Sequence, residues 1–229
     1  MTGADGMSGA PAADRPTAAA GDTRCEVVLV ALPAELSPVL RRRLEPLTFG
    51  DRPQQQRPET LVARALAGRL LAARHPAAAG TLRQLDSGKP VADGASLSIS
   101  HTAGVVAVAV CARGPLGIDI ERVGRPRPRV AGRVFAEQDA AGLAALPEAD
   151  QPLAFTRLWT VAEACTKLTG EGLGRLFGGL GPLGLGASGQ WSGSRWSSRI
   201  VGPGLVVSLA GPPDIIPAAA WVSCAAIVA

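Results

Sequence analysis

A chain of 229 residues is long enough for one large domain or two smaller halves, and its 47% hydrophobic content can form a sizeable core. Aromatic residues make up only 3%, with no tyrosine, so that core must consist mainly of Leu, Val and Ala. A formal net charge of +4 suits an acidic partner or a polyphosphate ligand. So small a charge, with so few aromatic residues, argues against nucleic-acid binding.

The sequence carries no pattern of a leader or of a membrane span. Residues 1–23 contain Ala, Gly, Asp, Pro and Thr without an apolar block, which predicts a disordered tail and not a signal peptide. The most apolar later stretch, residues 215–229, is short and interrupted by Pro217, so we expect no spanning helix. The four cysteines lie far apart without a C-x-x-C pair, which predicts buried free thiols in a reducing, cytoplasmic setting.

The first half of the chain predicts two helices and three strands. Residues 58–74 favour a helix, because Pro58 and Glu59 suit its first turn and Leu and Ala recur along one face. Residues 97–102 alternate apolar and polar side chains, the pattern of a half-buried strand. Apolar runs predict strands over 25–32 and 105–112. Pro38, which suits a first turn, predicts a short helix over 36–47.

Two carboxylates, Asp119 and Glu121, lie two residues apart in an apolar run that begins at Leu116. Side chains at i and i+2 of a strand point to the same face, so a strand over 116–121 would project both carboxylates together. Adjacent carboxylates repel each other unless a cation lies between them, and Mg²⁺ takes carboxylate oxygens together with phosphates and water. The alternative is a solvated strand end.

Residues 152–168 predict a second long helix, in which apolar side chains recur at three- and four-residue steps. Trp159, Glu163 and Lys167 lie at i, i+4 and i+8 and therefore share one stripe of this helix. The stripe is either an ordinary surface pair beside a tryptophan or the wall of a cleft. In the second case Glu163 is a candidate third carboxylate.

The remaining segments are less regular. Residues 122–133 are basic and interrupted by prolines, which predicts a loop, and residues 135–146 predict a helix. Beyond residue 174 the chain is rich in Gly and Pro. Short strands are predicted there around Trp191 and Trp196 and over 199–201, 205–209 and 221–228.

Four blocks, taken together and in order, resemble the 4′-phosphopantetheinyl transferases, in particular their larger, surfactin-type branch. These blocks are Gly88-Lys89-Pro90, Ser98-Ile-Ser-His-Thr102, Gly117-Ile-Asp-Ile-Glu121 and Trp159-x-x-x-Glu163-Ala-x-x-Lys167. The resemblance covers roughly residues 25–175. One position departs from the family pattern, because Ala162 stands where the family usually has lysine before the helix glutamate.

The order of elements and the resemblance together imply an α+β fold built from two similar halves, an intramolecular pseudo-dimer. The halves would meet near residue 113, with residues 24–112 in the first and 113–229 in the second. We expect a monomer with its ligand in the cleft between the halves, a usual place for a binding site.

The implied reaction transfers the 4′-phosphopantetheine group of coenzyme A to a serine of an apo carrier. The carrier is an acyl carrier protein or a peptidyl carrier domain, of fatty-acid, polyketide or nonribosomal-peptide synthesis. Asp119, Glu121 and Glu163 would hold Mg²⁺, with Mn²⁺ as a possible substitute. Glu163 would also take the serine proton, and Lys167 would offset the charge of the phosphates.

The resemblance also implies where coenzyme A binds. Lys89 and Pro90 would lie beside the adenine. Ser100, His101 and Lys167 would contact the phosphates, with Thr102 nearby. Arginine presents a fork of donors that suits phosphate oxygens, so Arg57, with Arg41 or a neighbour, is mapped to the terminal phosphate. A solvated surface is the alternative for these arginines.

Two rival functions stay open, and so does the role of the basic loop. The loop over 122–133 is either a solvated connection or a landing site for an acidic carrier protein, where charge raises the association rate. The first rival is a relative that binds coenzyme A or carriers without turnover, as Ala162 allows. The second is a different Mg²⁺-dependent phosphodiester enzyme, such as a nuclease. Neither nucleic acid nor a membrane is an expected partner.

Overall fold

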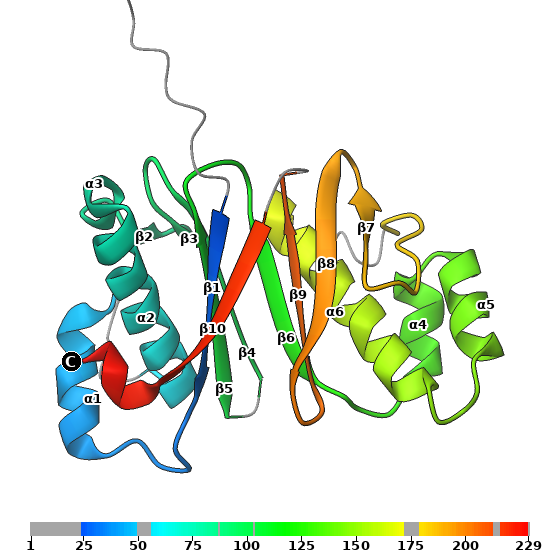
Figure 1. Cartoon of the computed structure of the whole chain (residues 1–229), viewed down its shortest axis with the longest axis horizontal. Coiled ribbons are helices and arrows are strands. Elements are labelled where there is room, and N and C mark those ends of the chain that lie inside the picture. Colours follow the sequence, from blue (N-terminus) through cyan, green and yellow to red (C-terminus); the bar gives the residue numbers. More distant parts are fainter. Residues whose placement is uncertain are drawn as a thin grey trace, which may run out of the picture.

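The computed structural model describes residues 24–49, 56–86, 88–102, 104–171, 179–212 and 216–228. The prediction of a disordered tail over residues 1–23 lies outside these ranges. Within them the chain mixes helices and sheets in an α+β fold. Figure 1 shows α1, α2 and α3 on one side of the molecule and α4, α5 and α6 on the other, with the strands between.

The first sheet has the strand order β10-β1-β5-β4. Its strands are β10 (Ile216–Ser223), β1 (Arg24–Ala31), β5 (Val105–Cys111) and β4 (Ser96–Thr102). β10 pairs in parallel with β1, whereas the β1–β5 and β4–β5 pairs are antiparallel. The end of the chain therefore returns to the sheet that its first strand builds (Figure 1).

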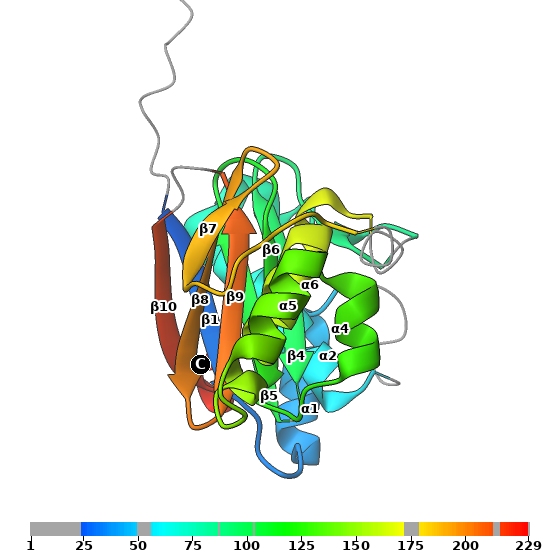
Figure 2. The same cartoon turned by 90° about the vertical axis from the view of Figure 1, so that its right-hand side faces the viewer.

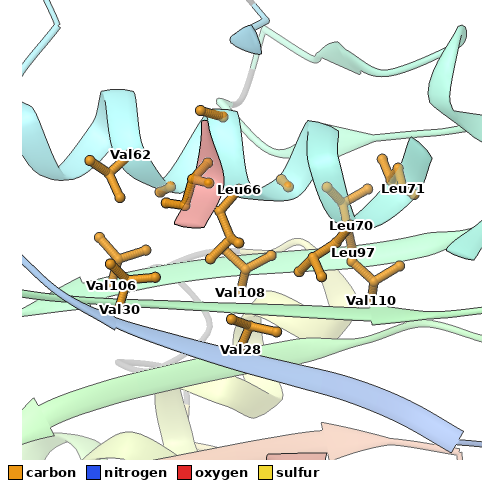
Figure 3. Close-up of a cluster of buried hydrophobic side chains, with 14 of the residues drawn as sticks. Val28, Val30, Val62, Leu66, Leu70, Leu71, Leu97, Val106, Val108 and Val110 are labelled. Carbon is orange, nitrogen blue, oxygen red and sulfur yellow. The ribbon is translucent and has the colours of Figure 1, made fainter. Parts of the chain in front are cut away.

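A long helix, α2 (Pro58–Arg74), covers one face of this sheet. In Figure 3, Val62, Leu66 and Leu70 of α2 lie over valines of β1 and β5. The side chains of α2 that are buried are all Leu, Val or Ala, as the scarcity of aromatic residues requires. Smaller elements complete this side, namely α1 (Pro38–Leu44), η1 (Glu45–Leu47), α3 (Pro76–Ala79), η3 (Cys224–Ile227) and the two-stranded pair β2 (Arg83–Gln84) and β3 (Pro90–Val91).

The second sheet is antiparallel, with the order β6-β9-β8-β7. Its strands are β6 (Gly117–Arg122), β9 (Leu205–Gly211), β8 (Ser194–Gly202) and β7 (Ser188–Trp191). The helix α6 (Gln151–Thr169) packs on this sheet, with α4 (Pro128–Val134) and α5 (Glu137–Ala145) beside it (Figure 2). The predicted boundary near residue 113 falls in the connection from β5 to β6, where the chain passes between the sheets.

Apolar side chains pack beneath the helices of each half, and a further apolar cluster lies between the two sheets. It forms because alternate residues of the strands point away from the helices. Val27 and Leu29 of β1, Ala107 of β5 and Ile118 and Ile120 of β6 all belong to it. The same alternation leaves Asp119 and Glu121 on the opposite face of β6, toward α6. Residues of β4 that face the second half are hydroxyls instead of apolar side chains, so the seam between the halves becomes polar beside β4 and β6.

Most of the predicted elements are confirmed within a few residues, and two predictions are wrong. The basic segment 122–133 is not entirely a loop, because Pro128 starts α4 and Ala131 and Val134 are buried against the second half. The predicted strand over 221–228 ends instead at Ser223, whose side chain accepts a hydrogen bond from the Ala226 amide and starts a 3-10 turn.

The four cysteines are buried and free, as predicted. Burial raises the pKa of the Cys165 thiol to about 12, so it stays protonated and unreactive at neutral pH. None of the helices that the structure describes is both apolar enough and long enough to cross a membrane.

Candidate active site

The site begins with a glycine that lets α6 lie directly on β6. A Cβ atom at Gly117 would collide with the Ala164 carbonyl oxygen and would lie 2.7 Å from the Leu168 amide nitrogen. Only a residue without a side chain allows this approach of strand to helix. As a result, Glu163 and Lys167, one turn apart on α6, reach the carboxylates of β6.

Asp119 lies at the centre of the polar seam and is only 4% exposed. Its Oδ1 accepts hydrogen bonds from Lys167 Nζ and from Ser100 Oγ, both at 2.7 Å. Its second oxygen, Oδ2, is buried and has no hydrogen-bond partner among the described residues. A buried carboxylate oxygen without a partner is costly, which makes this atom a natural ligand for a cation.

Two further carboxylates, Glu121 and Glu163, are half-buried near Asp119. Burial is the largest cause that raises the pKa of Glu121, and the charge of Asp119 also contributes. Burial likewise raises the pKa of Glu163, and the charge of Asp119 is the second cause. The surroundings of both glutamates therefore disfavour the charged form of the side chain, chiefly through burial.

This donor set fits a hard cation chemically, because it has three carboxylates, one with an unpartnered oxygen and two whose charged forms are disfavoured by burial. Among the described residues, however, no three side chains already stand in a ligating arrangement. Lys167 instead supplies the positive charge beside Asp119.

These groups line one cavity of about 380 Å³ at the junction of the two halves. The second half contributes Asp119, Glu121, Trp159, Glu163 and Lys167, and the first half contributes the rest of the lining, including Arg64, Pro90, Ser100 and His101. The predicted stripe of Trp159, Glu163 and Lys167 on α6 does face a cavity. The site is therefore assembled from residues that lie far apart in sequence.

The other predicted coenzyme A residues are distributed around this cavity. Pro90, Ser100 and His101 belong to its lining, and Thr102 donates a hydrogen bond to Glu121 Oε2 at 2.8 Å. Lys89 lies in the adjacent cavity with Lys167 and Gly170. Its ammonium group donates to the carbonyl oxygens of Lys167 and Leu168, at 2.9 and 3.4 Å, in the last turn of α6.

The arginine that lines the cavity is Arg64, which the sequence reasoning did not select. Arg41 and Arg57 lie outside the lining, and Arg41 donates to the carbonyl oxygen of Gln56. Arg64 is held by the carbonyl oxygen of Phe49 at 3.0 Å and by Gln84 Oε1 at 2.6 Å. Thr60 precedes it by one turn and lines the same cavity, so a polar break in the apolar helix 58–74 was the available signal.

A second cavity, of about 330 Å³, adjoins the first and shares Glu121 and Trp159 with it. Its rim carries Arg122, Arg125 and Arg127. Its floor includes Phe155, whose ring stacks on that of Trp159 with 6.5 Å between the ring centroids. The basic segment 122–127 therefore opens beside the carboxylates.

Comparison with known families places this geometry in context. Residues 115–183 match the family model of the 4′-phosphopantetheinyl transferase superfamily. The matched segment contains β6 and α6, and with them all three carboxylates and Lys167. The resemblance to the 4′-phosphopantetheinyl transferases is confirmed.

A curated relative points to the same class of enzyme. The 4′-phosphopantetheinyl transferase gsp of Aneurinibacillus migulanus is 33% identical to this chain over 92 residues. That match covers 40% of this chain and 38% of the relative's length. Because the match spans well under two thirds of the transferase from that organism, the activity of the whole protein is a matter of proposal.

Proposed function

We propose that this protein transfers the 4′-phosphopantetheine group from coenzyme A to a serine of an apo carrier protein. The observation that carries the proposal is the convergence of Asp119, Glu121, Glu163 and Lys167 in one cavity between the halves. The family match over the same segment supports the class of reaction. The carrier is an acyl carrier protein or a peptidyl carrier domain.

Asp119, Glu121 and Glu163 would hold Mg²⁺, with Mn²⁺ as a substitute, through the oxygens that lack other partners. The metal would supply charge stabilisation for the pyrophosphate oxygens. Lys167 adds a fixed positive charge on the same side, 2.7 Å from Asp119. The set thus offers both the negative ligands and the positive charge that phosphoryl transfer needs.

The chain's own residues would handle the proton and the leaving group. The serine oxygen of the carrier forms a bond to the β-phosphorus of coenzyme A. The bond between that phosphorus and the oxygen that bridges the two phosphates breaks, and 3′,5′-adenosine bisphosphate leaves with the bridging oxygen. Glu163 would take the serine proton, directly or through water. Its pKa, raised by burial, suits a general base better than that of an exposed glutamate.

Coenzyme A would lie along the first-half wall of the cavity. Lys89 and Pro90 would flank the adenine, and His101 at the exposed end of β4 would reach a phosphate. For the terminal phosphate, Arg41 and Arg57 remain candidates by resemblance, and the position of Arg64 in the lining favours it. Ser100 and Thr102 are assigned to the same ligand by resemblance, although their hydroxyls are bonded to carboxylates here.

The basic rim of the second cavity would receive the acidic carrier. Arg122, Arg125 and Arg127 lie beside Glu121, so a carrier held there would present its serine close to the carboxylates. Rim charge of this kind chiefly raises the association rate. This placement favours the landing-site interpretation of residues 122–127 over that of a solvated connection.

The arrangement of the sheets supports two further parts of the proposal. Each sheet has four strands and carries one long helix, α2 or α6, which suits an intramolecular pseudo-dimer. Because both walls of the cavity come from one chain, we expect a monomer. We also expect a cytoplasmic enzyme without nucleic-acid or membrane partners.

The test is to incubate the protein with Mg²⁺, coenzyme A and an apo carrier domain, and then to measure the intact mass of the carrier. The proposal expects a gain of one phosphopantetheine group, which EDTA abolishes and which a carrier without its serine does not show. Heat protection by coenzyme A without a mass gain would favour a binding relative instead. Cleavage of coenzyme A or of nucleic acid without a carrier would favour a different metal-dependent enzyme.

A further inference from the structure

Two of the four free cysteines lie directly opposite each other, although they stand far apart in sequence. Cys25 is the second residue of β1 and Cys111 is the last residue of β5, and the antiparallel register of these strands pairs the two. Both side chains are buried in the apolar cluster between the sheets. Cys165 and Cys224 belong to the separate clusters of the second and the first half.

The backbone hydrogen bonds of these strands show which kind of pair the two cysteines form. In an antiparallel ladder, pairs that exchange backbone hydrogen bonds alternate with pairs that do not. The Leu32 amide donates to the Gly104 carbonyl oxygen at 2.9 Å, at the step that follows the last pair of the register. The even-numbered residues of β1 are therefore in hydrogen-bonded pairs. The odd-numbered ones, Cys25 with Cys111 among them, are in non-hydrogen-bonded pairs.

Non-hydrogen-bonded pairs bring opposite side chains closest together. Their Cα atoms stand about 4.5 Å apart, within the range of about 4.4–6.8 Å that a disulfide spans. The thiols of Cys25 and Cys111 are hydrogen-bonded to each other, and this bond, followed by burial, raises the pKa of the Cys25 thiol. The backbone can therefore stay in place while a bond forms between the two sulfur atoms.

We propose that Cys25 and Cys111 form a disulfide when the protein meets a low-molecular-weight disulfide, and that this bond stabilises the fold. One protein thiolate attacks a sulfur atom of the reagent and releases one reagent thiol. The second protein thiolate then attacks the mixed disulfide and releases the other reagent thiol. Two S–H bonds of the protein give way to one S–S bond, and the two reagent thiols take up the two protons and the two electrons.

The bond would close a long loop of the chain. This loop contains α1, α2 and β4, which form most of the first half. A cross-link stabilises mainly by restricting the unfolded chain, and the restriction grows with the length of the loop. None of the described residues that line the cavity of the candidate site lies on β1 or β5, so the bond would form away from that site.

Access to the thiols limits how fast the bond forms. Both thiols are buried, and the raised pKa of Cys25 leaves little thiolate at neutral pH. Each residue lies at or next to the end of its strand, where local opening costs least. The disulfide should therefore form slowly at neutral pH and faster as the pH rises toward the pKa of the thiol.

The test incubates the folded wild-type chain with cystamine at alkaline pH, then alkylates the remaining thiols in denaturant and counts them by mass. We expect the loss of two of the four thiols. Peptide mapping should place the new bond between Cys25 and Cys111. The melting temperature should rise by about 5–15 °C and return to its starting value in reductant.

Matched variants assign the effect to this pair. The double variant Cys165→Ala with Cys224→Ala keeps only the pair, so it should form the same disulfide and show the same rise. Cys25→Ala and Cys111→Ala each lack one partner, so neither should form a disulfide within the chain. Thermal melts in reductant show that each variant is folded before it is oxidised.

Three results would overturn the proposal. Four thiols that all survive the incubation in the wild-type chain would show that the pair does not react. A bond that joins Cys165 or Cys224 would show that the opposite position on the strands does not select the partners. A bond between Cys25 and Cys111 that lowers the melting temperature would show that it strains the strands instead of stabilising the fold.

Discussion

The two long helices of the molecule occupy equivalent places and have different compositions. α2 and α6 have 17 and 19 residues, and each covers a four-stranded sheet. The buried side chains of α2 are Leu, Val and Ala, whereas those of α6 include Thr156, Thr160 and Thr166. Thr160 shares a hydrogen bond of 2.7 Å with Ser208 of β9, inside the second half. The first helix thus mainly packs, and the second also carries polar groups.

The strands that meet at the seam show the same contrast. Every residue of β5 is buried and apolar, so both of its faces serve packing. β6 directs Ile118 and Ile120 to the first sheet and its carboxylates toward α6. One half therefore supplies the carboxylates that we propose as metal ligands, and the other supplies the wall of the cavity together with the hydroxyls that bond to Asp119 and Glu121.

The largest expected effect comes from the contact that seats α6. Gly117→Ala would place a Cβ atom against backbone atoms of Ala164 and Leu168, which cannot move without moving the helix. We expect a loss of about 3 kcal/mol or more in the free energy of unfolding, at the upper end for overpacking. Urea unfolding measures it.

Gly132→Ala is the matched control, because nothing lies within 4 Å of a Cβ atom at that position of α4. Helix propensity should stabilise this variant by up to about 1 kcal/mol. If Gly117→Ala unfolds at the same urea concentration as this control, the close approach of α6 to β6 is not needed.

The sequence revealed the elements that have a local pattern, and it did not reveal contacts between distant segments. Periodicity is local, so the helix over 58–74 and the strands over 97–102 and 105–112 were predictable almost to the residue. The apolar positions of α4 were hidden by arginines and prolines. The pairing of β10 with β1 joins opposite ends of the chain, and no local pattern specifies it.

The candidate site divides in the same way. The carboxylates and the stripe on α6 were predictable, because spacing on one element places side chains on one face. The place of Arg64 in the cavity lining depends on several separate elements, and Asp119 and Lys167, which bond to Ser100, lie 19 and 67 residues away from it. Such contacts are set by how the halves meet, which spacing does not encode.

The next largest effect should appear at Glu163. Glu163→Gln removes both the proposed base and one of the proposed metal ligands, so carrier loading should fall by at least about a hundredfold. The folded, metal-free chain should be as stable as the wild type or more so, because the amide avoids the burial and repulsion that raise the glutamate pKa. Loading rates and thermal melts in EDTA measure the two effects.

Glu137→Gln, on the exposed start of α5, is the control for this experiment and should keep the wild-type loading rate. A Glu163→Gln chain that loads carrier as fast as this control would remove Glu163 from the mechanism.

A smaller effect is expected at Lys89, which ties the first half to the end of α6. Lys89→Met keeps the length of the side chain and removes its bonds to the carbonyl oxygens of Lys167 and Leu168. We expect a loss of about 1 kcal/mol in unfolding free energy. Amide exchange in residues that follow Lys167 should also become faster.

Arg83→Met provides the comparison within one half, because Arg83 and Asp93 form an exposed ion pair at 3.0 Å. Such pairs contribute about 0–1 kcal/mol, so this variant should lose less stability than Lys89→Met. The reverse order would mean that the contact between the halves contributes little.

The smallest effect on rate should come from Ala162. Its side chain is fully buried in the core of the second half, so it does not line the cavity. Ala162→Lys, which restores the usual family residue, should lower stability through burial of a charge. It should change the loading rate of the folded protein by less than about threefold, well short of the tenfold step that 1.4 kcal/mol brings.

Ala162→Met is the control of comparable length without charge, and its rate should match that of the lysine variant. A gain of about tenfold or more in Ala162→Lys alone would show that the chain lacks a cation. The interpretation as a weakly active relative would then be favoured.

We propose that Asp119, which accepts a hydrogen bond from Ser100 of the opposite half, is a metal ligand of a phosphopantetheinyl transferase. The most direct measurement is the rate at which Asp119→Asn loads an apo carrier, beside the wild type, at saturating Mg²⁺ and coenzyme A. We expect loading by the wild type and none detectable by the folded variant. An unchanged rate in Asp119→Asn would contradict this assignment.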